Sequence, residues 1–166
     1  MIIGIVSDSH GRTDRLAAAL ELLRDRGARA VVHCGDVGGL EDLKVLGRCG
    51  LVAWAVLGNV DRHVQRLLEA AWGLGIDASA EVVQVDLSDG RRLAATHGHD
   101  GAQLRELIAQ GQFAYVCHGH SHLRRDDRIG GTRIINPGAL HRSAPPSLAV
   151  LDTVADRLEF LELTAR

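Results

Sequence analysis

The stretch Ile2-Ile3-Gly4-Ile5-Val6-Ser7-Asp8-Ser9-His10-Gly11 decides the fold. Its first half is a short apolar run rich in Ile and Val, which predicts a buried strand over residues 2–6. The run ends abruptly at polar residues, among them the metal-binding types Asp8 and His10. Residues two apart on an extended segment point the same way, so we expect both side chains to reach one ion.

The same succession of an apolar run and a polar cluster recurs along the chain. The further clusters are Gly35-Asp36, Gly58-Asn59, Thr96-His97-Gly98 and Gly119-His120-Ser121-His122. In open α/β folds, ligands bind beyond the carboxyl ends of the strands, so these clusters are expected to meet at one sheet edge. Together with Asp8 and His10 they supply two Asp, one Asn and four His, close to the ligand set of two adjacent divalent metals. Flanking glycines would let the backbone approach the ions.

Patterns between the clusters predict the order of helices and strands. The first half alternates strand and helix, which favours parallel strands with crossover helices. The second half contains three strand pairs with turns, typical of antiparallel hairpins. Helices are expected at 13–26, 40–47, 61–72 and 102–109, and strands at 2–6, 31–34, 52–57, 81–87, 91–96, 113–117, 124–129, 132–135, 147–151 and 158–163. We therefore expect a layered α/β domain with two mixed sheets packed face to face.

Length and composition bound the class of protein. At 166 residues, the chain is long enough for one well-buried core and too short for two ordinary domains, so we expect a single domain over residues 1–166. Hydrophobic residues make up 46% and charged residues 24%, a balance typical of globular proteins that are neither disordered nor membrane-embedded. A net charge of −2 and an aromatic content of 3% argue against a surface for duplex nucleic acid.

The cysteines and the first residues bear on the compartment. Cys34, Cys49 and Cys117 cannot all pair, and two of them end apolar runs in which buried free thiols are common. The first residues lack the positive segment of a signal peptide, and no apolar run is long enough to cross a bilayer. We therefore expect a cytoplasmic protein without a membrane partner.

The donor set indicates the kind of ion. Mixed nitrogen and oxygen ligands suit Mn²⁺, Fe, Zn²⁺, Co²⁺ or Ni²⁺ better than Mg²⁺ or Ca²⁺, and structural zinc would use cysteines. Mn²⁺ is our first choice. Asp36 stands alone in its cluster and can bridge two ions through both carboxylate oxygens. Asp8 and Asp36 cancel two of the four positive charges of two divalent ions, which leaves room for a hydroxide and an anionic phosphate ester.

With these residues in hand, the chain resembles the calcineurin-like metallophosphoesterase superfamily, and most closely its small YfcE-like phosphodiesterase group. The resemblance covers essentially the whole length. It is carried by the motifs Ser7-Asp8-Ser9-His10-Gly11, His33-Cys34-Gly35-Asp36, Leu57-Gly58-Asn59-Val60-Asp61, Thr96-His97-Gly98-His99, Gly119-His120-Ser121-His122 and Asn136-Pro137-Gly138.

The resemblance implies a four-layer α-β-β-α sandwich and a metal-dependent phosphodiesterase acting on a small phosphodiester. The implied ligands are Asp8, His10, Asp36 and His122 for one ion, and Asp36, Asn59, His97 and His120 for the other. A hydroxide bridging the two ions would attack phosphorus in line. Catalytic roles then fall on Asp36, Asn59 and His97.

Val60 departs from the family pattern. Many members carry a His directly after the motif Asn, where it can protonate the leaving group or contact the phosphate, and valine can do neither. General-acid help is worth roughly 10² to 10⁴ in rate, so substrates with poor leaving groups should react slowly. His99 or His141 could substitute only if the fold brings them near. His99 and Arg142 are the candidate substrate contacts.

Several alternatives stay open. The enzyme could be a phosphomonoesterase or nucleotide hydrolase. The absence of a His at Val60 makes this alternative less favoured than a phosphodiesterase. A different class would be a non-catalytic metal-binding scaffold resembling the retromer subunit, although every ligand position is filled here. Asp61 either begins the helix at 61–72 or supports a metal ligand. The exposed hairpins would suit a homodimer.

Overall fold

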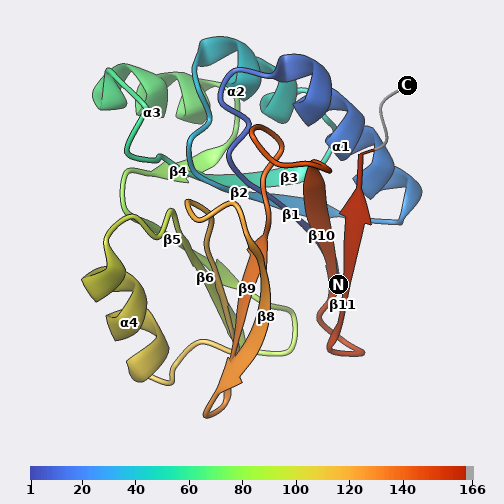
Figure 1. Cartoon of the computed structure of the whole chain (residues 1–166), viewed down its shortest axis with the longest axis vertical. Helices are drawn as coiled ribbons and strands as arrows, with labels where there is room; N and C mark the ends of the chain where they lie inside the picture. The colour runs from blue at the N-terminus through green and yellow to red at the C-terminus, as the bar shows by residue number, and fades with distance from the viewer. Residues whose placement is uncertain (164–166) are drawn as a thin grey trace.

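The first strand, β1, lies inside a six-stranded mixed sheet in the computed structural model, which describes residues 1–163 (Figure 1). Its strands lie in the order β11 (Arg157–Glu162), β10 (Ser147–Asp152), β1 (Ile2–Val6), β2 (Ala30–Cys34), β3 (Val52–Val56) and β4 (Asp77–Ser79). The pairs from β1 to β4 are parallel, and β10 runs antiparallel to both of its neighbours.

A second, five-stranded sheet packs against the first. Its strands lie in the order β5 (Val82–Asp86), β6 (Arg92–Thr96), β7 (Tyr115–Cys117), β9 (Thr132–Pro137) and β8 (Arg124–Ile129). The pairs β6–β7 and β7–β9 are parallel, whereas β5 and β8 run antiparallel at the two edges. All three predicted hairpins are confirmed, since β5–β6, β8–β9 and β10–β11 are antiparallel pairs.

Helices cover the outer face of each sheet, which confirms the four-layer α-β-β-α sandwich (Figure 1). The helices are α1 (Thr13–Asp25), α2 (Leu40–Gly47), α3 (Val64–Gly73) and α4 (Gly101–Ala109). The first three pack on the six-stranded sheet, and α4 packs on the five-stranded sheet. Successive side chains of a strand point to opposite faces, so Val31 packs toward the helices and Val32 toward the other sheet. Every residue of β2 is therefore buried.

Two predicted elements need correction. The third helix begins at Val64 instead of residue 61, because His63 takes a left-handed φ of 59° and Asp61 is held by other contacts. Strand β4 was not expected, since its three residues are too few to show a pattern. Residues 164–166 of the predicted single domain lie outside the described residues. Within residues 1–163, no helix is long and apolar enough to cross a bilayer.

Candidate metal centre

Polar residues from both sheets meet at the carboxyl ends of their strands, as the sequence predicts. Asp8 follows β1 and Asp36 follows β2, while His97 follows β6 of the other sheet. Backbone hydrogen bonds join these loops directly: the N–H of Asp8 donates to the Gly35 carbonyl at 3.0 Å, and the N–H of Gly119 donates to the His97 carbonyl at 3.0 Å. Between the sheets, Nδ1 of His97 lies 2.9 Å from the carbonyl oxygen of Cys34, so the loops form one connected surface at the joint edge.

The backbone of most predicted ligands is left-handed, which corrects the expectation of an extended segment at Asp8 and His10. Asp and His enter this region more readily than most residue types, and observed cases concentrate at functional sites. The left-handed turns, not a two-residue alternation, bring the side chains together. The residues and their φ angles are Asp8 at 54°, His10 at 49°, Asp36 at 52°, His120 at 66° and His122 at 57°.

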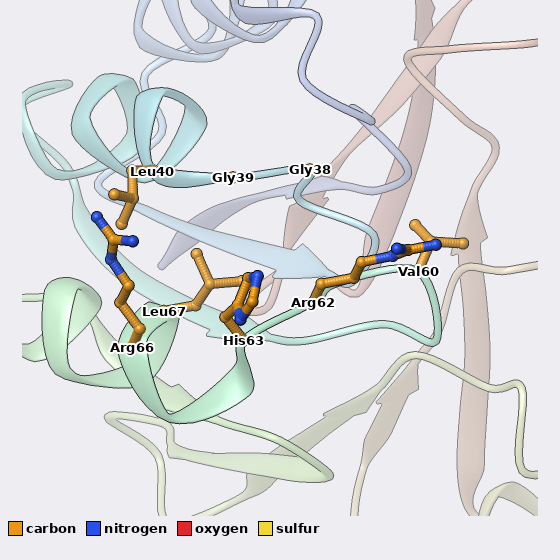
Figure 2. Close-up of a pocket in the computed structure, with 8 residues that line it drawn as sticks. All are labelled: Gly38, Gly39, Leu40, Val60, Arg62, His63, Arg66 and Leu67. Atoms are coloured by element: carbon orange, nitrogen blue, oxygen red, sulfur yellow. The ribbon is translucent and has the colours of Figure 1, made fainter.

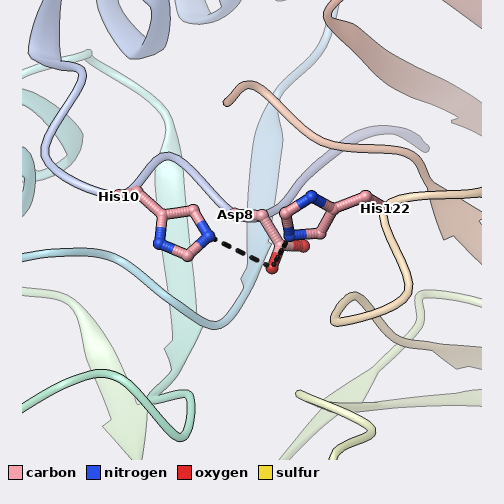
Figure 3. Close-up of side chains that lie close together, drawn as sticks. All are labelled: Asp8, His10 and His122. Atoms are coloured by element: carbon pink, nitrogen blue, oxygen red, sulfur yellow. Dashed lines mark ion pairs between the residues drawn. The ribbon is translucent and has the colours of Figure 1, made fainter. Parts of the chain in front are cut away.

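The first group of ligands consists of Asp8, His10 and His122 (Figure 3). Oδ1 of the buried Asp8 lies 3.1 Å from Nε2 of His122 and 3.8 Å from Nε2 of His10. Within the described residues, Asp8 Oδ1 and His10 Nε2 are buried atoms without a hydrogen-bond partner. Buried polar atoms are normally satisfied, so this pair fits a cation that both atoms would bind.

The second group consists of Asp8, Asp36 and His97. Oδ1 of Asp36 lies 3.3 Å from Nε2 of His97, and Oδ2 of Asp36 lies 3.6 Å from Nε2 of His10. The two oxygens of one carboxylate thus face histidines of two different predicted ions. This is the arrangement that the predicted bridging role of Asp36 requires.

His97 is oriented as a nitrogen ligand. Its Nδ1–H donates to the carbonyl oxygen of Cys34 at 2.9 Å, which leaves Nε2 to bind a metal. Nε2 faces Oδ1 of Asn59 at 3.0 Å and Oδ1 of Asp36 at 3.3 Å. A nitrogen lone pair and oxygen lone pairs repel unless a proton or a metal ion lies between them. These donors therefore fit a divalent cation.

Charge and burial have opposite effects on this cluster. Burial lowers the pKa of His97, but the contacts with Asp36 and the Cys34 carbonyl outweigh it, so the pKa lies above its ordinary value. For Asp36, burial raises the pKa, but His97 and the Val60 N–H bring it below the ordinary value. The cluster thus favours a positive charge between these two side chains.

The remaining predicted ligand, His120, lies beside His97 with 5.1 Å between the ring centroids. Burial lowers its pKa, which favours the neutral form of the ring, the form that binds a metal. Its backbone N–H donates to Oδ2 of Asp8 at 3.2 Å, so the loop that carries it is tied to the first group. The structure therefore brings all seven predicted ligands together, and their binding of metal stays a prediction.

Two glycines allow the loops to close on the carboxylates. A Cβ on Gly58 would collide with Oδ1 of Asp36, and a Cβ on Gly119 would collide with the Ser7 hydroxyl and lie 2.7 Å from Oδ2 of Asp8. Any other residue type would have to push a predicted metal-binding carboxylate away. These glycines approach the predicted ligands closely, and the predicted approach of the backbone to the ions stays a prediction.

Asp61 supports the site and does not begin the helix. Its carboxylate accepts backbone N–H groups of Val37 at 3.1 Å, Gly38 at 2.8 Å and Gly58 at 2.8 Å. These donors lie in the loops that carry Asp36 and Asn59. Of the two roles open to Asp61 from the sequence, the structure therefore selects the supporting one.

The three remaining candidate residues, His99, His141 and Arg142, differ in how close they lie to the site. The ring centroid of His99 lies 5.5 Å from that of His97 and 6.3 Å from that of His120, so the fold brings His99 to the site. The ring centroid of His141 lies 5.5 Å from that of His10. Its buried Nδ1 has no hydrogen-bond partner among residues 1–163. Arg142 is exposed, and no described contact joins it to the site. Its contact with substrate stays a prediction.

Comparison with known proteins identifies relatives of the same family that the sequence motifs resemble. The model of the calcineurin-like phosphoesterase superfamily domain matches residues 1–156. A phosphodiesterase from Methanocaldococcus jannaschii is 29% identical and covers 98% of both chains. The phosphodiesterase YfcE from Escherichia coli is 32% identical, over 92% of this chain and 88% of its own.

Solved structures show the same fold. An archaeal phosphodiesterase superposes with a TM-score of 0.88 at 28% identity and covers 98% of this chain and 100% of its own. Vacuolar protein sorting 29 from Cryptosporidium parvum superposes with a TM-score of 0.67 at 18% identity, over 99% of this chain and 98% of its own. At that identity the likeness to the sorting protein is one of fold alone.

Proposed function

This chain belongs to the calcineurin-like phosphoesterase superfamily, and we propose that it is a metal-dependent phosphodiesterase acting on a small phosphodiester. The reaction class is supported by relatives named phosphodiesterase. One observation carries the proposal: the carboxylate of Asp36 places its two oxygens 3.3 Å from His97 and 3.6 Å from His10. One carboxylate between two sets of nitrogen donors suits a pair of ions.

The chain's own residues would hold the two ions and orient the substrate. The ions would supply the positive charge that the phosphoryl oxygens need. Two divalent ions bound here would activate a water molecule and neutralise the phosphoryl oxygens. In the reaction, the water oxygen forms a bond to phosphorus, and the bond from phosphorus to one alcohol breaks as that alcohol leaves with a proton. The N–H of Val60 holds Oδ1 of Asp36 at 3.1 Å, but its side chain cannot donate that proton. We therefore propose diesters with good leaving groups as the substrates hydrolysed best.

Mn²⁺ is the ion that we propose first, with Fe, Zn²⁺, Ni²⁺ and Co²⁺ as alternatives. The mixed nitrogen and oxygen donors of the two groups support this choice. A metal screen on chelator-treated protein would test it: Mn²⁺ should restore more activity than any other of these ions. A higher rate with another ion would replace our first choice.

The decisive experiment compares bis-p-nitrophenyl phosphate with p-nitrophenyl phosphate. We expect the diester to be hydrolysed faster with Mn²⁺, and chelator or the substitution Asp36→Ala to abolish the activity. The matched control is Asp25→Asn, which alters an exposed carboxylate at the end of α1 and should leave the rate unchanged.

Each other outcome identifies an alternative. Activity that survives chelator or Asp36→Ala would exclude the two-metal mechanism. A preference for the monoester would favour the phosphomonoesterase alternative. If the protein binds Mn²⁺ tightly but hydrolyses neither ester with any of the five metals, the non-catalytic scaffold becomes the better explanation.

A further inference from the structure

A cavity of about 280 Å³ opens between the beginnings of α2 and α3 (Figure 2). One wall is the backbone of residues 38–40, and the other carries the side chains of Arg62, His63 and Arg66. In Figure 2, Arg66 extends from α3 toward Leu40, while Arg62 extends toward Val60. The two guanidinium groups thus lie at opposite ends of one concave space.

The cavity adjoins the predicted metal centre through two residues, Val60 and Gly38. The side chain of Val60 lines the cavity, and its backbone N–H donates to Oδ1 of Asp36 at 3.1 Å. A second connection runs through Gly38, which lines the cavity and packs so closely on the backbone of Gly11 that a Cβ would collide there. Val60 thus contacts Asp36 through its backbone and the cavity through its side chain, so the cavity and the predicted bridging carboxylate lie one residue apart.

No ion pair among residues 1–163 neutralises the arginines that line this cavity. Within residues 1–163, neither Arg62 nor Arg66 forms an ion pair, and no acidic side chain lines the cavity. The closest acidic residue in sequence, Asp61, is buried and already accepts three backbone N–H groups. The apolar side chains of Val60 and Leu67 complete the lining.

We propose that this cavity binds a second phosphate group, carried on one alcohol arm of the diester substrate. A guanidinium group matches phosphate with paired hydrogen bonds, and an arginine at each end makes the whole cavity favourable for an anion. Val60 and Leu67 would contact the carbon part of the arm between the two phosphates. This inference rests on the proposed function, because the phosphorus that reacts must lie at Asp36.

The test uses two substrates that differ by one phosphate. They are the p-nitrophenyl ester of thymidine 5′-phosphate and the same ester with an added 3′-phosphate. We expect the added phosphate to raise kcat/KM by about tenfold in the wild type. The double variant Arg62→Gln, Arg66→Gln should lose this preference and keep its rate on bis-p-nitrophenyl phosphate.

The control is Arg105→Gln, which removes an exposed arginine of α4 and should keep the full preference. The inference is overturned if the wild type treats the two esters alike. It is also overturned if the double variant retains the preference, or loses the same factor on all three diesters.

A binding measurement separates this inference from the proposed function. Calorimetry on chelator-treated protein, with thymidine 3′-phosphate as the probe, reports on the cavity without any reaction. We expect the double variant to bind the probe about tenfold more weakly than the wild type or Arg105→Gln. If binding depends on the arginines but no diester is hydrolysed, the proposed function fails and the phosphate site stands. Equal binding by all three proteins would overturn the phosphate site, whatever the activity.

Discussion

The hydroxyl of Ser9 donates a 2.7 Å hydrogen bond to Oδ2 of Asp42, a buried residue of α2. The same oxygen accepts the N–H of Gly11 at 3.2 Å. Asp42 thus holds the residues on both sides of His10, and the predicted metal-binding loop depends on a helix that contributes no predicted ligand. Partners that orient metal ligands in this way typically affect metal affinity strongly.

Replacing Asp42 by Ala should weaken metal binding without removing a ligand. We expect the affinity for Mn²⁺ to fall by about tenfold or more, because the loop carrying Asp8 and His10 loses its anchor. The free energy of unfolding of the metal-free protein should fall by about 1–3 kcal/mol, since Gly11 loses its acceptor. Calorimetric titration and urea unfolding would measure both. Asp42→Asn keeps an acceptor and should lose less; an Ala variant with wild-type affinity would contradict the role of Asp42.

His33 should make the protein less stable in acid. Nε2 of this fully buried ring lies 3.0 Å from the Ser9 hydroxyl, and Nδ1 accepts the N–H of Gly35 at 3.3 Å, so the ring is neutral. Burial lowers its pKa from 6.5 to about 3. Between these two values the unfolded chain binds more protons than the folded chain. Stability from this group is therefore present above pH 6.5 and lost as the pH falls below it, by up to about 1.4 kcal/mol per pH unit.

The substitution His33→Gln tests this contribution. Glutamine can accept and donate hydrogen bonds but does not titrate, so the decline in unfolding free energy between pH 7 and pH 5 should be smaller than in the wild type. Urea unfolding of metal-free protein at the two pH values would measure it. Equal declines in the two proteins would show that His33 is not the group responsible.

Val60→His should restore a proton donor beside the site. The side chain is 45% exposed, and its hydrogen bond to Asp36 uses only the backbone N–H, so the substitution leaves that contact intact. We expect monoester hydrolysis to rise by about 10²-fold or more for phenyl phosphate, whose leaving group needs a proton, and less for p-nitrophenyl phosphate. Val60→Gln, which is polar but not an acid, is the control. An equal gain for both esters, or a gain with Gln, would argue against acid catalysis.

Gly58→Ala should disturb the metal centre although it adds only one methyl group. Its Cβ would collide with Oδ1 of Asp36, so we expect affinity for Mn²⁺ to fall by about tenfold or more. Gly73→Ala is the matched control, because this helical glycine at the end of α3 has open space around it. That control should be neutral or stabilise the protein by about 0.5–1 kcal/mol. Calorimetric titration with Mn²⁺ would show whether the two variants differ.

The sequence was sufficient to predict every strand except β4, and to predict the sheet edge at which the candidate ligands meet. Apolar runs that stop at Asp8, Asp36 and His97 mark strand ends, and parallel strands bring their ends together whatever the details of packing. This is why the two packed sheets and the assembly of the seven candidate ligands could be predicted, whereas the four-layer order was implied by the family resemblance. Strand β4 was not predicted because three residues are too few to show the two-residue alternation of a strand.

Other features depend on contacts between distant segments. His141 reaches the site because its backbone N–H donates to the Asp8 carbonyl at 3.0 Å, a contact that no local pattern indicates. The three hydrogen bonds of Asp61 likewise come from two separate loops. The cavity lined by Arg62 and Arg66 exists only because α2 and α3 lie next to each other. Spacing along the chain carries none of this information.

The left-handed ligands have a consequence for how such a site could be lost. Each residue other than glycine costs about 1 kcal/mol in that backbone region, so Asp8, His10, Asp36, His120 and His122 together keep the chain below the stability it could reach. Replacing one of them by glycine would relieve the strain while removing a donor atom. A descendant released from catalysis could therefore gain thermal stability by such a replacement at His10 or His120, whose side chains form no hydrogen bond within residues 1–163, and selection for activity alone would hold these positions against that drift.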